Sequence, residues 1–408
     1  MIPVRLGPAE IKLIEQLNVV GASAEAERLA AIGLPTRRIE SYHYTDLKQL
    51  LRVVPELADA AGPGQTFDAL RDAGPPRLTV AGAFQLAIAN GQVQKHGTAP
   101  AGVIVGESKG GVLTTRDDIV TRLNAAFVTD ALTLELAGAV EPVIQVDRRV
   151  EGNAAHSASA ARIFVAEGGS AVILEVYSGS DEAHLSNHST FLQVGKGARV
   201  THITVNLMGR HASHFATNEY LLGEDANLRT LVINAGAQLS RTQLFPRFAG
   251  AGATADVTGL NLVSDGQHAD ITMDALHAVP HTSSKPLFKS IARGRSKAVV
   301  QGRLVVARDA QKTDAKLMSQ GLMLSDEAEI LSKPELEIYA DDVVCGHGST
   351  CGQLDEDSLF YLVSRGIPKA EAETMLLRAF LAELVDPIED QALNEALTDV
   401  IDGWLLQG

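Results

Sequence analysis

Four stretches in the middle of the chain share one pattern, and they are GGSAVILEVYS from Gly168, GKGARVTHITV from Gly195, GEDANLRTLVI from Gly223 and GAGATADVTGL from Gly250. In each, a glycine-rich turn and a small residue lead into a segment of alternating polarity, which is typical of a β-strand. The alanines that open the strands follow at intervals of 27, 28 and 27 residues: Ala171, Ala198, Ala226 and Ala253. A turn and a strand repeated at a fixed period indicate a solenoid, so we predict a mainly β fold with a parallel β-helix over residues 76–350. A β-sandwich with regular hairpins is the alternative.

Helical patterns flank this repeat on both sides. Residues 1–75 form the predicted N-terminal helical region, in which Pro8 suits a first helical turn. Two turn-rich stretches, AAGPGQ at 60–65 and DAGPP at 72–76, mark its end. Residues 351–408 form the predicted C-terminal helical domain. Because the two ends of a β-helix expose unpaired strand edges, we expect the helical regions to cap them, or one end to pair with a partner.

The last helix of the chain carries a regular apolar stripe that includes the only tryptophan, Trp404. Such a stripe packs against a neighbouring helix as core, or it docks on a partner protein through an aromatic anchor. Phe380, on the preceding helix, and Trp404 are the candidate anchors. The residues alone leave both interpretations open.

Both cysteines lie in the stretch VCGHGSTCG at 344–352, where the repeat meets the C-terminal domain. If this stretch is a strand, its alternation puts Cys345, His347, Ser349 and Cys351 on one face and three glycines on the other. The Cα atoms of Cys345 and His347 would be roughly 6.6 Å apart, close enough for the side chains to share a metal ion, whereas Cys345 and Cys351 would be about 20 Å apart. Two ligands are too few for a closed metal site. The alternative is two inert, packed cysteines beside a surface histidine.

Composition and motifs argue against several classes of function. The formal net charge of −15 argues against a nucleic-acid or anionic-membrane surface, so we expect protein partners. No apolar run reaches the roughly 18 residues of a spanning helix, and the start MIPVRLGPAEIK does not resemble a signal peptide, which predicts a cytoplasmic protein. Two cysteines in 408 residues fit a reducing compartment. No G-x4-GK[ST] phosphate loop is complete, so any ATP use belongs to another subunit.

The histidines of the repeat come in pairs three or four residues apart: His184 and His188, His211 and His214, His277 and His281. On a strand, neither spacing brings two imidazoles to one ion, so we expect these histidines at the surface or in turns. No Ser-His-Asp or paired-carboxylate arrangement can be assigned from the order of the residues, which leaves a hydrolase without support.

The run AQKTDAKLMSQGLMLSDEAEILSKPELEIYADDVVCGHGSTCGQLDEDSLFYLVSRGI at 310–367 resembles the C-terminal signature of the SufB/SufD family of iron–sulfur cluster assembly proteins. The matching pieces are Ala310 to Ala315, Pro334 to Asp342, Cys345, His347, Gly348 and Phe360 to Ile367. The segment LPTRRIESYHYTDL at 34–47 adds to the resemblance, although its role stays open. The scarcity of cysteine favours the SufD branch of the family over the SufB branch.

The resemblance implies a right-handed parallel β-helix and a non-enzymatic scaffold subunit of a SufB–SufC–SufD complex. The end of the β-helix would pair with SufB, and the C-terminal helices would dock SufC, an ABC-type ATPase. Cys345 and His347 then become candidate metal ligands at the SufB junction, while Cys351 departs from the family pattern and its role is open. We expect no cofactor in the isolated chain and iron or a nascent iron–sulfur cluster in the complex. Whether flavin binds stays open.

Two other functions are compatible with a β-helix. One is a carbohydrate-active enzyme of the polysaccharide lyase type, for which the sequence shows neither a signal peptide nor aromatic sugar platforms. The other is a stand-alone homodimer that delivers iron, and whether the isolated chain is a monomer or a homodimer stays open. Co-purification with SufB distinguishes these functions from the scaffold.

Overall fold

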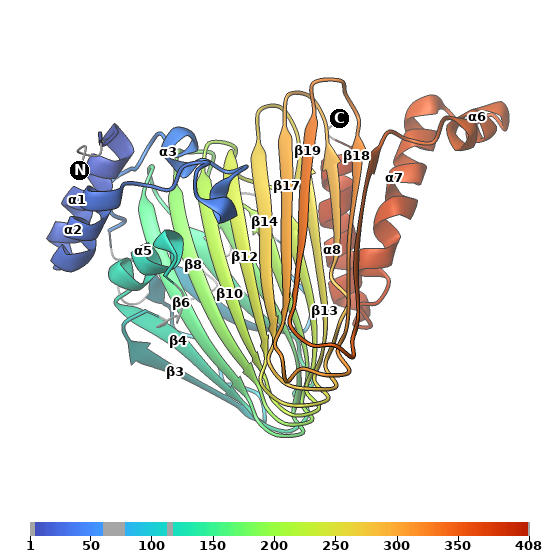
Figure 1. Cartoon of the computed structure of the whole chain (residues 1–408). Coiled ribbons are helices and arrows are strands. Elements are labelled where there is room, and N and C mark those ends of the chain that lie inside the picture. The colour runs from blue at the N-terminus through green and yellow to red at the C-terminus, as the bar shows by residue number, and fades with distance from the viewer. Residues whose placement is uncertain (1–4, 60–77, 112–116, 407–408) are drawn as a thin grey trace.

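The computed structural model describes residues 5–59, 78–111 and 117–406, and its centre is a parallel β-helix of about eight turns (Figure 1). Two sheets form its walls. The first sheet contains β1 (Phe84–Ala89), β2 (Gln92–Val93), β5 (Ile144–Val150), β7 (Ser170–Gly179), β9 (Arg199–Leu207), β11 (Asn227–Asn234), β13 (Thr254–Val263), β15 (Ser283–Ser284), β16 (Leu287–Ala292), β18 (Asp314–Met323) and β20 (Val344–Gly352). The second contains β3 (Val103–Lys109), β4 (Asp130–Leu136), β6 (His156–Val165), β8 (Leu185–Val194), β10 (Ser213–Leu222), β12 (Leu239–Phe248), β14 (His268–His277), β17 (Lys297–Val306) and β19 (Glu329–Ile338). The predicted mainly β fold with a parallel β-helix is confirmed.

Each period of the sequence repeat is one full turn, with one strand in each sheet. Strands pair in parallel with those one turn before and after, and only β1–β2 and β3–β4 pair antiparallel among the named strands. The register corrects the first interval of the alanine repeat. Ala171 pairs with Val200, so the residue equivalent to Ala198 is Gly169, 198 − 169 = 29 residues earlier.

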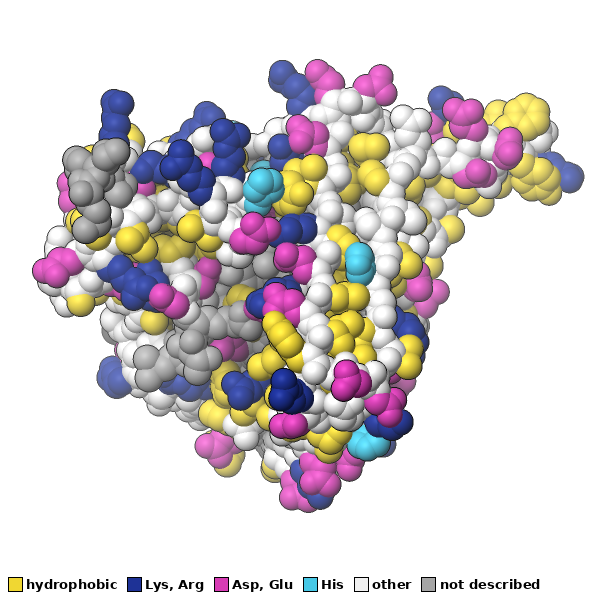
Figure 2. Space-filling view, viewed as in Figure 1, with side chains coloured by type: hydrophobic (Ala, Val, Ile, Leu, Met, Phe, Trp, Pro, Cys, Tyr) yellow, Lys and Arg dark blue, Asp and Glu magenta, His cyan; other side chains and the backbone are white. Residues whose placement is uncertain are grey.

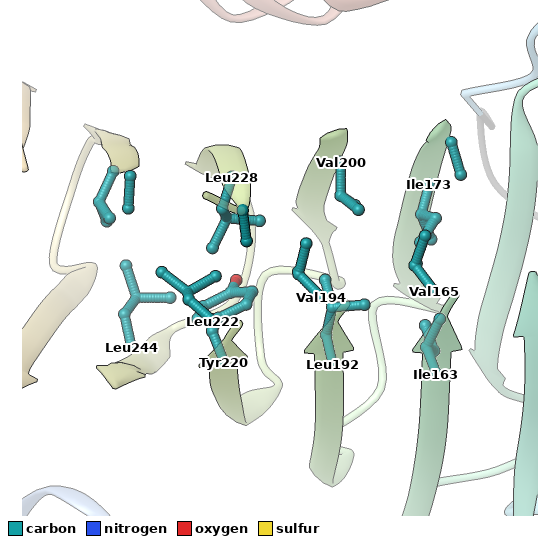
Figure 3. Close-up of a cluster of buried hydrophobic side chains, with 14 of the residues drawn as sticks. Ile163, Val165, Ile173, Leu192, Val194, Val200, Tyr220, Leu222, Leu228 and Leu244 are labelled. Carbon is teal, nitrogen blue, oxygen red and sulfur yellow. The ribbon is translucent and has the colours of Figure 1, made fainter. Parts of the chain in front are cut away.

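The interior of the β-helix is built from the inward faces of both sheets. Figure 3 shows how aliphatic side chains from successive turns meet there, with Ile163, Leu192 and Leu222 from the second sheet facing Ile173 and Val200 from the first. All five are at most 2% exposed. Burial of such side chains contributes about 2 kcal/mol each, which makes the stacked interior the main source of stability.

The described terminal helices cover the outer faces of the sheets, which corrects the first of our two expectations, that they cap the ends of the β-helix. On one side, α1 (Pro8–Val19), α2 (Ser23–Ile32), α3 (Leu47–Leu50) and α5 (Ile119–Phe127) pack on the second sheet, and the 3-10 turn η1 (Glu40–Tyr42) lies between α2 and α3. On the other, α7 (Lys369–Val385) and α8 (Gln391–Leu405) pack on the first sheet, and α6 (Glu356–Ser364) extends away from it (Figure 1).

The reason for this placement lies in the outward-facing residues. Leu174, Ile203 and Leu231 pair in successive strands and form an apolar row on the outside of the first sheet, and together with Leu260 they belong to one buried cluster with the C-terminal helices. An exposed row of this kind would favour aggregation, so the sheet needs a covering layer.

The predicted domain boundary at 60–76 lies outside the described residues. No helix of the described chain has both the length and the apolar character needed to cross a membrane.

Candidate functional site at the open end of the β-helix

The β-helix ends in two edge strands. Within the described chain, β20 pairs with β18 and β19 pairs with β17, and neither has a partner strand on its other side. Each therefore presents unpaired backbone N–H and C=O groups, which is the geometry that accepts a strand from another chain. We call the surface formed by β19 and β20 the open end.

The two strands also leave uncovered the inward-facing positions that are buried in earlier turns. Cys345 lies opposite Ala315, and His347 lies opposite Leu317. Ala315 and Leu317 are 0% and 2% exposed and line the interior. The inward-facing residues of β20 are therefore the continuation of that interior, left uncovered because no further turn follows. Alternation along the strand places Ser349 and Cys351 on the same face, as the sequence predicted.

The thiol and the imidazole differ in their surroundings. The side chain of Cys345 is half-buried and packs against the last interior residues, whereas His347 is exposed. Burial raises the pKa of the Cys345 thiol, and the backbone of Ala315 opposes this shift. The thiol is therefore protonated at neutral pH and becomes a thiolate when a base takes its proton or when a bound metal ion displaces the proton to solvent. Cys351 is exposed, and partial burial also raises its pKa.

An apolar row on β19 lies beside the inward-facing residues of β20. In β19, Ile330, Pro334, Leu336 and Ile338 lie opposite buried interior residues of β17 and are themselves half-buried or exposed. Figure 2 shows hydrophobic side chains visible from outside in the strip between the last strands. The open end thus combines free strand edges, apolar surface and two potential metal ligands.

The opposite face of β20 carries glycine. A Cβ atom added at Gly346 or Gly352 would meet no heavy atom within 4 Å, so the chain itself does not require glycine at either position. At Gly348 the added atom would meet the side chain of Met318. Glycine without an internal steric reason favours close approach of a backbone from outside.

The open end carries two candidate metal ligands, Cys345 and His347. Over residues 5–59, 78–111 and 117–406, no group of three or more His, Cys, Asp or Glu side chains is placed to hold a metal ion. Cys345 and His347 supply a thiolate and an imidazole, both of which suit iron, but a closed site needs further ligands. Those ligands would have to come from another molecule.

The two residues predicted as docking anchors lie within the packing of the C-terminal helices. Trp404 is 6% exposed, and Phe380 is half-buried beneath Lys289, whose Nζ lies 4.6 Å from the ring centre. Among the C-terminal helices, the exposed aromatic residues are instead on α6, which has no buried residue: Phe360 is 73% exposed and Tyr361 is 56% exposed. Leu359, Phe360 and Leu362 give this helix an apolar stripe in the sequence, but the sequence does not show whether another element covers it.

The segment at 34–47 is a packed connection. Tyr42 donates a hydrogen bond to Asp118 at 2.6 Å, and its ring lies 4.1 Å from the guanidinium carbon of Arg241. Thr45 bonds His268 at 2.9 Å and also bonds Asp270, which pairs with Arg241. Arg37 and Arg38 are exposed, so the segment fixes the N-terminal helices to the second sheet through its tyrosine and threonine.

The expectation that these histidines lie at the surface or in turns is wrong for three of the six. His188, His214 and His277 lie on strands and are at most 2% exposed, whereas His211 and His281 are exposed and His184, 1% exposed, lies in the connection between β7 and β8. Burial lowers the pKa of each buried imidazole, that of His214 to about 3 and that of His277 to about 4. They are neutral members of hydrogen-bonded networks at physiological pH.

Fold and open end together define a parallel β-helix protein whose last two strands, β19 and β20, have no further partner strand within the described chain. Residues 148–380 match the family model described as SUF system FeS cluster assembly, SufBD core domain, and the chain belongs to this family. The resemblance found in the sequence is thereby confirmed, and the interpretation as a polysaccharide lyase is set aside.

The relatives agree with this assignment. The iron-sulfur cluster assembly protein SufD of Escherichia coli (strain K12) is 27% identical over 390 residues, which cover 92% of this chain and 90% of that protein. An iron-sulfur cluster assembly SufBD family protein of Synechocystis is 32% identical over 220 residues, 54% of this chain and 49% of that protein. A SufBD family protein of Mycobacterium tuberculosis is 32% identical over 217 residues, 51% of this chain and 55% of that protein. The chain therefore matches nearly all of the first relative and about half of the other two.

Proposed function

We propose that this chain is the non-catalytic scaffold subunit of a complex with SufB and SufC, and that its open end pairs with SufB. The observation that carries this proposal is the continuation of the interior into β19 and β20 without a covering turn. A related β-helix placed end to end would supply strands for both free edges and cover the apolar row of β19. The glycines of β20 allow its backbone to approach closely.

Pairing would also complete the ligand set. Cys345 and His347 would face the junction, where side chains of SufB supply the remaining ligands for iron or for a nascent cluster. The metal is the cargo of the complex in this proposal. The half-buried thiol loses its proton when it binds, and the exposed imidazole of His347 offers a nitrogen ligand from the same face.

The C-terminal helices are the proposed docking site for SufC, in which ATP hydrolysis takes place. Because Trp404 and Phe380 are engaged within the chain, the contact falls on α6, whose Phe360 and Tyr361 are exposed. Aromatic side chains on a projecting helix are typical anchors for a partner groove. The short link between β20 and α6, residues 353–355, connects this helix directly to the open end.

Co-expression tests the proposal. The full chain is produced with SufB carrying an affinity tag and with SufC, and the purified material is examined for subunit stoichiometry and for bound iron and sulfide. We expect a complex of all three subunits whose metal content depends on both β-helix subunits. Recovery of this chain as an iron-loaded homodimer that does not bind SufB would support the stand-alone delivery function instead.

A further inference from the structure

A polar sector occupies one side of the β-helix interior, remote from the open end. Arg148 of β5 and Glu175 of β7 are both 0% exposed and form an ion pair with 2.8 Å between Nη2 and Oε2. Glu175 also accepts hydrogen bonds from Tyr177 at 3.0 Å and from Thr190 at 2.7 Å, and it lies 3.2 Å from Nε2 of His202. The carboxylate is therefore fully engaged, and the charge of Arg148 is balanced.

Several polar atoms beside this ion pair have no partner in the described protein. They are Nε of Arg148, Nε2 of His188, Nε2 of His214, and both the nitrogen and the oxygen of the Asn218 amide. Each of the four side chains is at most 2% exposed. The other ring nitrogen of each histidine is held by a serine, at 2.7 Å from Ser159 for His188 and at 2.9 Å from Ser186 for His214. Both imidazoles are thus fixed in orientation with one nitrogen left over.

These atoms belong to one neighbourhood, centred on the ring of Tyr177. That ring lies 5.0 Å from the His188 ring, 4.8 Å from the His214 ring and 5.9 Å from the guanidinium carbon of Arg148. The two imidazole rings are 5.7 Å apart. Asn218 lies opposite Thr190 in the next turn, and the Thr190 hydroxyl accepts a 2.7 Å hydrogen bond from Arg148.

The chemistry of the leftover atoms defines what fits among them. Arg148 Nε and the Asn218 nitrogen donate, whereas the Asn218 oxygen accepts, so the ligand must be able to do both. A metal ion cannot accept from Arg148 or Asn218, and the one nearby carboxylate, Glu175, is already engaged. An anion would leave the Asn218 oxygen without a donor. A small uncharged molecule that donates and accepts meets every requirement, and water is such a molecule.

We propose that Arg148, His188, His214 and Asn218 bind ordered water sealed inside the β-helix, where it joins the two imidazoles to the Arg148–Glu175 ion pair. This internal water site links six consecutive strands of the two sheets, from β5 to β10, into one hydrogen-bonded unit. It goes beyond the scaffold function, because it concerns the interior of the isolated chain and needs no partner. Buried polar groups that are fully satisfied in this way fix the arrangement of the surrounding strands.

A crystal structure of the full chain at a resolution that shows ordered water is the direct test. We expect density for water within hydrogen-bond distance of Nε2 of His188, of Nε2 of His214 and of the Asn218 amide. A dry site overturns the proposal, and so does density that anomalous scattering identifies as a metal ion. This measurement uses the unaltered protein and does not depend on the folding of any variant.

Magnetic relaxation dispersion of the solvent provides the matching experiment in solution, since it counts water molecules that stay bound for long times. Asn218→Leu removes both amide atoms from the site, and Asn227→Leu makes the same chemical change at an exposed position on β11. We expect the long-lived water signal to fall in the first variant and to stay unchanged in the second. Equal signals from the two variants and the unaltered chain would contradict the proposal.

Discussion

Arg293 stacks on Trp404, with its guanidinium carbon 3.7 Å from the centre of the indole ring. The same guanidinium donates a hydrogen bond of 2.5 Å to the backbone carbonyl of Trp404. Arg293 follows β16 directly, so this contact fastens the last turn of α8 to the first sheet. The tryptophan therefore acts within the chain as the end of a buried row that includes Leu393, Leu397 and Ile401.

Trp404→Asp is expected to destabilise the protein. The change removes a large buried side chain and places a carboxylate in an apolar environment, which costs about 4 kcal/mol of the free energy of unfolding. Urea unfolding followed by circular dichroism measures the loss, with Trp404→Phe as the milder control. An unchanged unfolding midpoint would show that the indole is not part of the core.

Phe360→Asp is expected to leave the stability of the protein nearly unchanged and to weaken binding of a partner. Its side chain is 73% exposed on α6, so the free energy of unfolding should change by no more than about 0.5 kcal/mol. Binding of SufC should weaken by roughly tenfold or more, because an aromatic anchor is lost, while pairing with SufB persists. A pulldown with each partner separately measures both effects. Ser364→Asp, on the same exposed helix, is the control. Equal loss in both variants would mean that the added charge and not the lost ring weakens binding, and unchanged binding by the Phe360 variant would place the contact elsewhere.

Two neighbouring residues of β20 test the open end. Ser349 lies opposite buried Ser319 on the inward face, and Thr350 lies on the other face of the strand. Both are exposed, so arginine at either position leaves the isolated chain folded. Ser349→Arg places a charge over the proposed junction and should weaken co-purification with SufB by roughly tenfold or more, whereas Thr350→Arg should have a smaller effect. The reverse order would mean that the partner contacts the outer face.

His347→Ala tests the proposed ligand role. The imidazole is exposed, so its loss should leave the free energy of unfolding within about 0.5 kcal/mol of the unaltered value and should leave pairing with SufB in place. Cluster assembly in cells that depend on this chain should fail, because the junction loses a metal ligand. Growth complementation measures the outcome beside Thr350→Ala. Normal growth with the His347 variant would remove the imidazole from the proposed site.

The β-helix was predictable because its turns impose a local backbone requirement. Gly168, Gly197, Asp225 and Gly252 occupy equivalent places in successive turns, and all four have positive φ, between 52° and 75°. Only glycine takes this conformation without cost, and aspartate tolerates it better than most residues. Because a residue that tolerates positive φ is needed once per turn, glycine or aspartate recurs periodically in the sequence, whatever side chains pack around it.

The burial of these histidines was not predictable from polarity. In part of the second sheet, polar residues face the interior and apolar residues face outward, the reverse of the usual arrangement. In β10, His214 and Asn218 face the interior, while Phe215 faces outward and is 4% exposed beneath the N-terminal helices. A strand covered on both faces carries no polarity signal that tells inside from outside. The role of Trp404 was not predictable for a similar reason. The apolar stripe of its helix does not indicate whether the sheet or a partner protein covers it.

The buried histidines predict that the protein loses stability in mild acid. Burial lowers the pKa of His156, His268 and His277 to about 4 and that of His214 to about 3, against 6.5 for an exposed imidazole. Below pH 6.5 the unfolded chain binds protons that the folded chain does not, so stability is complete above this pH and declines as the pH falls toward 4. Each imidazole contributes up to about 1.4 kcal/mol per pH unit in this window.

Urea unfolding between pH 8 and pH 4.5 measures this slope. His156 is a suitable probe, because its Nδ1 lies 2.8 Å from the side-chain oxygen of Gln16 and it can be replaced by Gln. His156→Gln should lower the slope by about 1.4 kcal/mol per pH unit between pH 4.5 and pH 6, whereas replacing exposed His211 by Gln should leave it unchanged. The Arg148–Glu175 pair does not confound the result: the pKa of Glu175 is about 2, so its contribution is lost only as the pH falls below about 4.5. Equal slopes for the two variants would mean that His156 titrates freely in the folded protein.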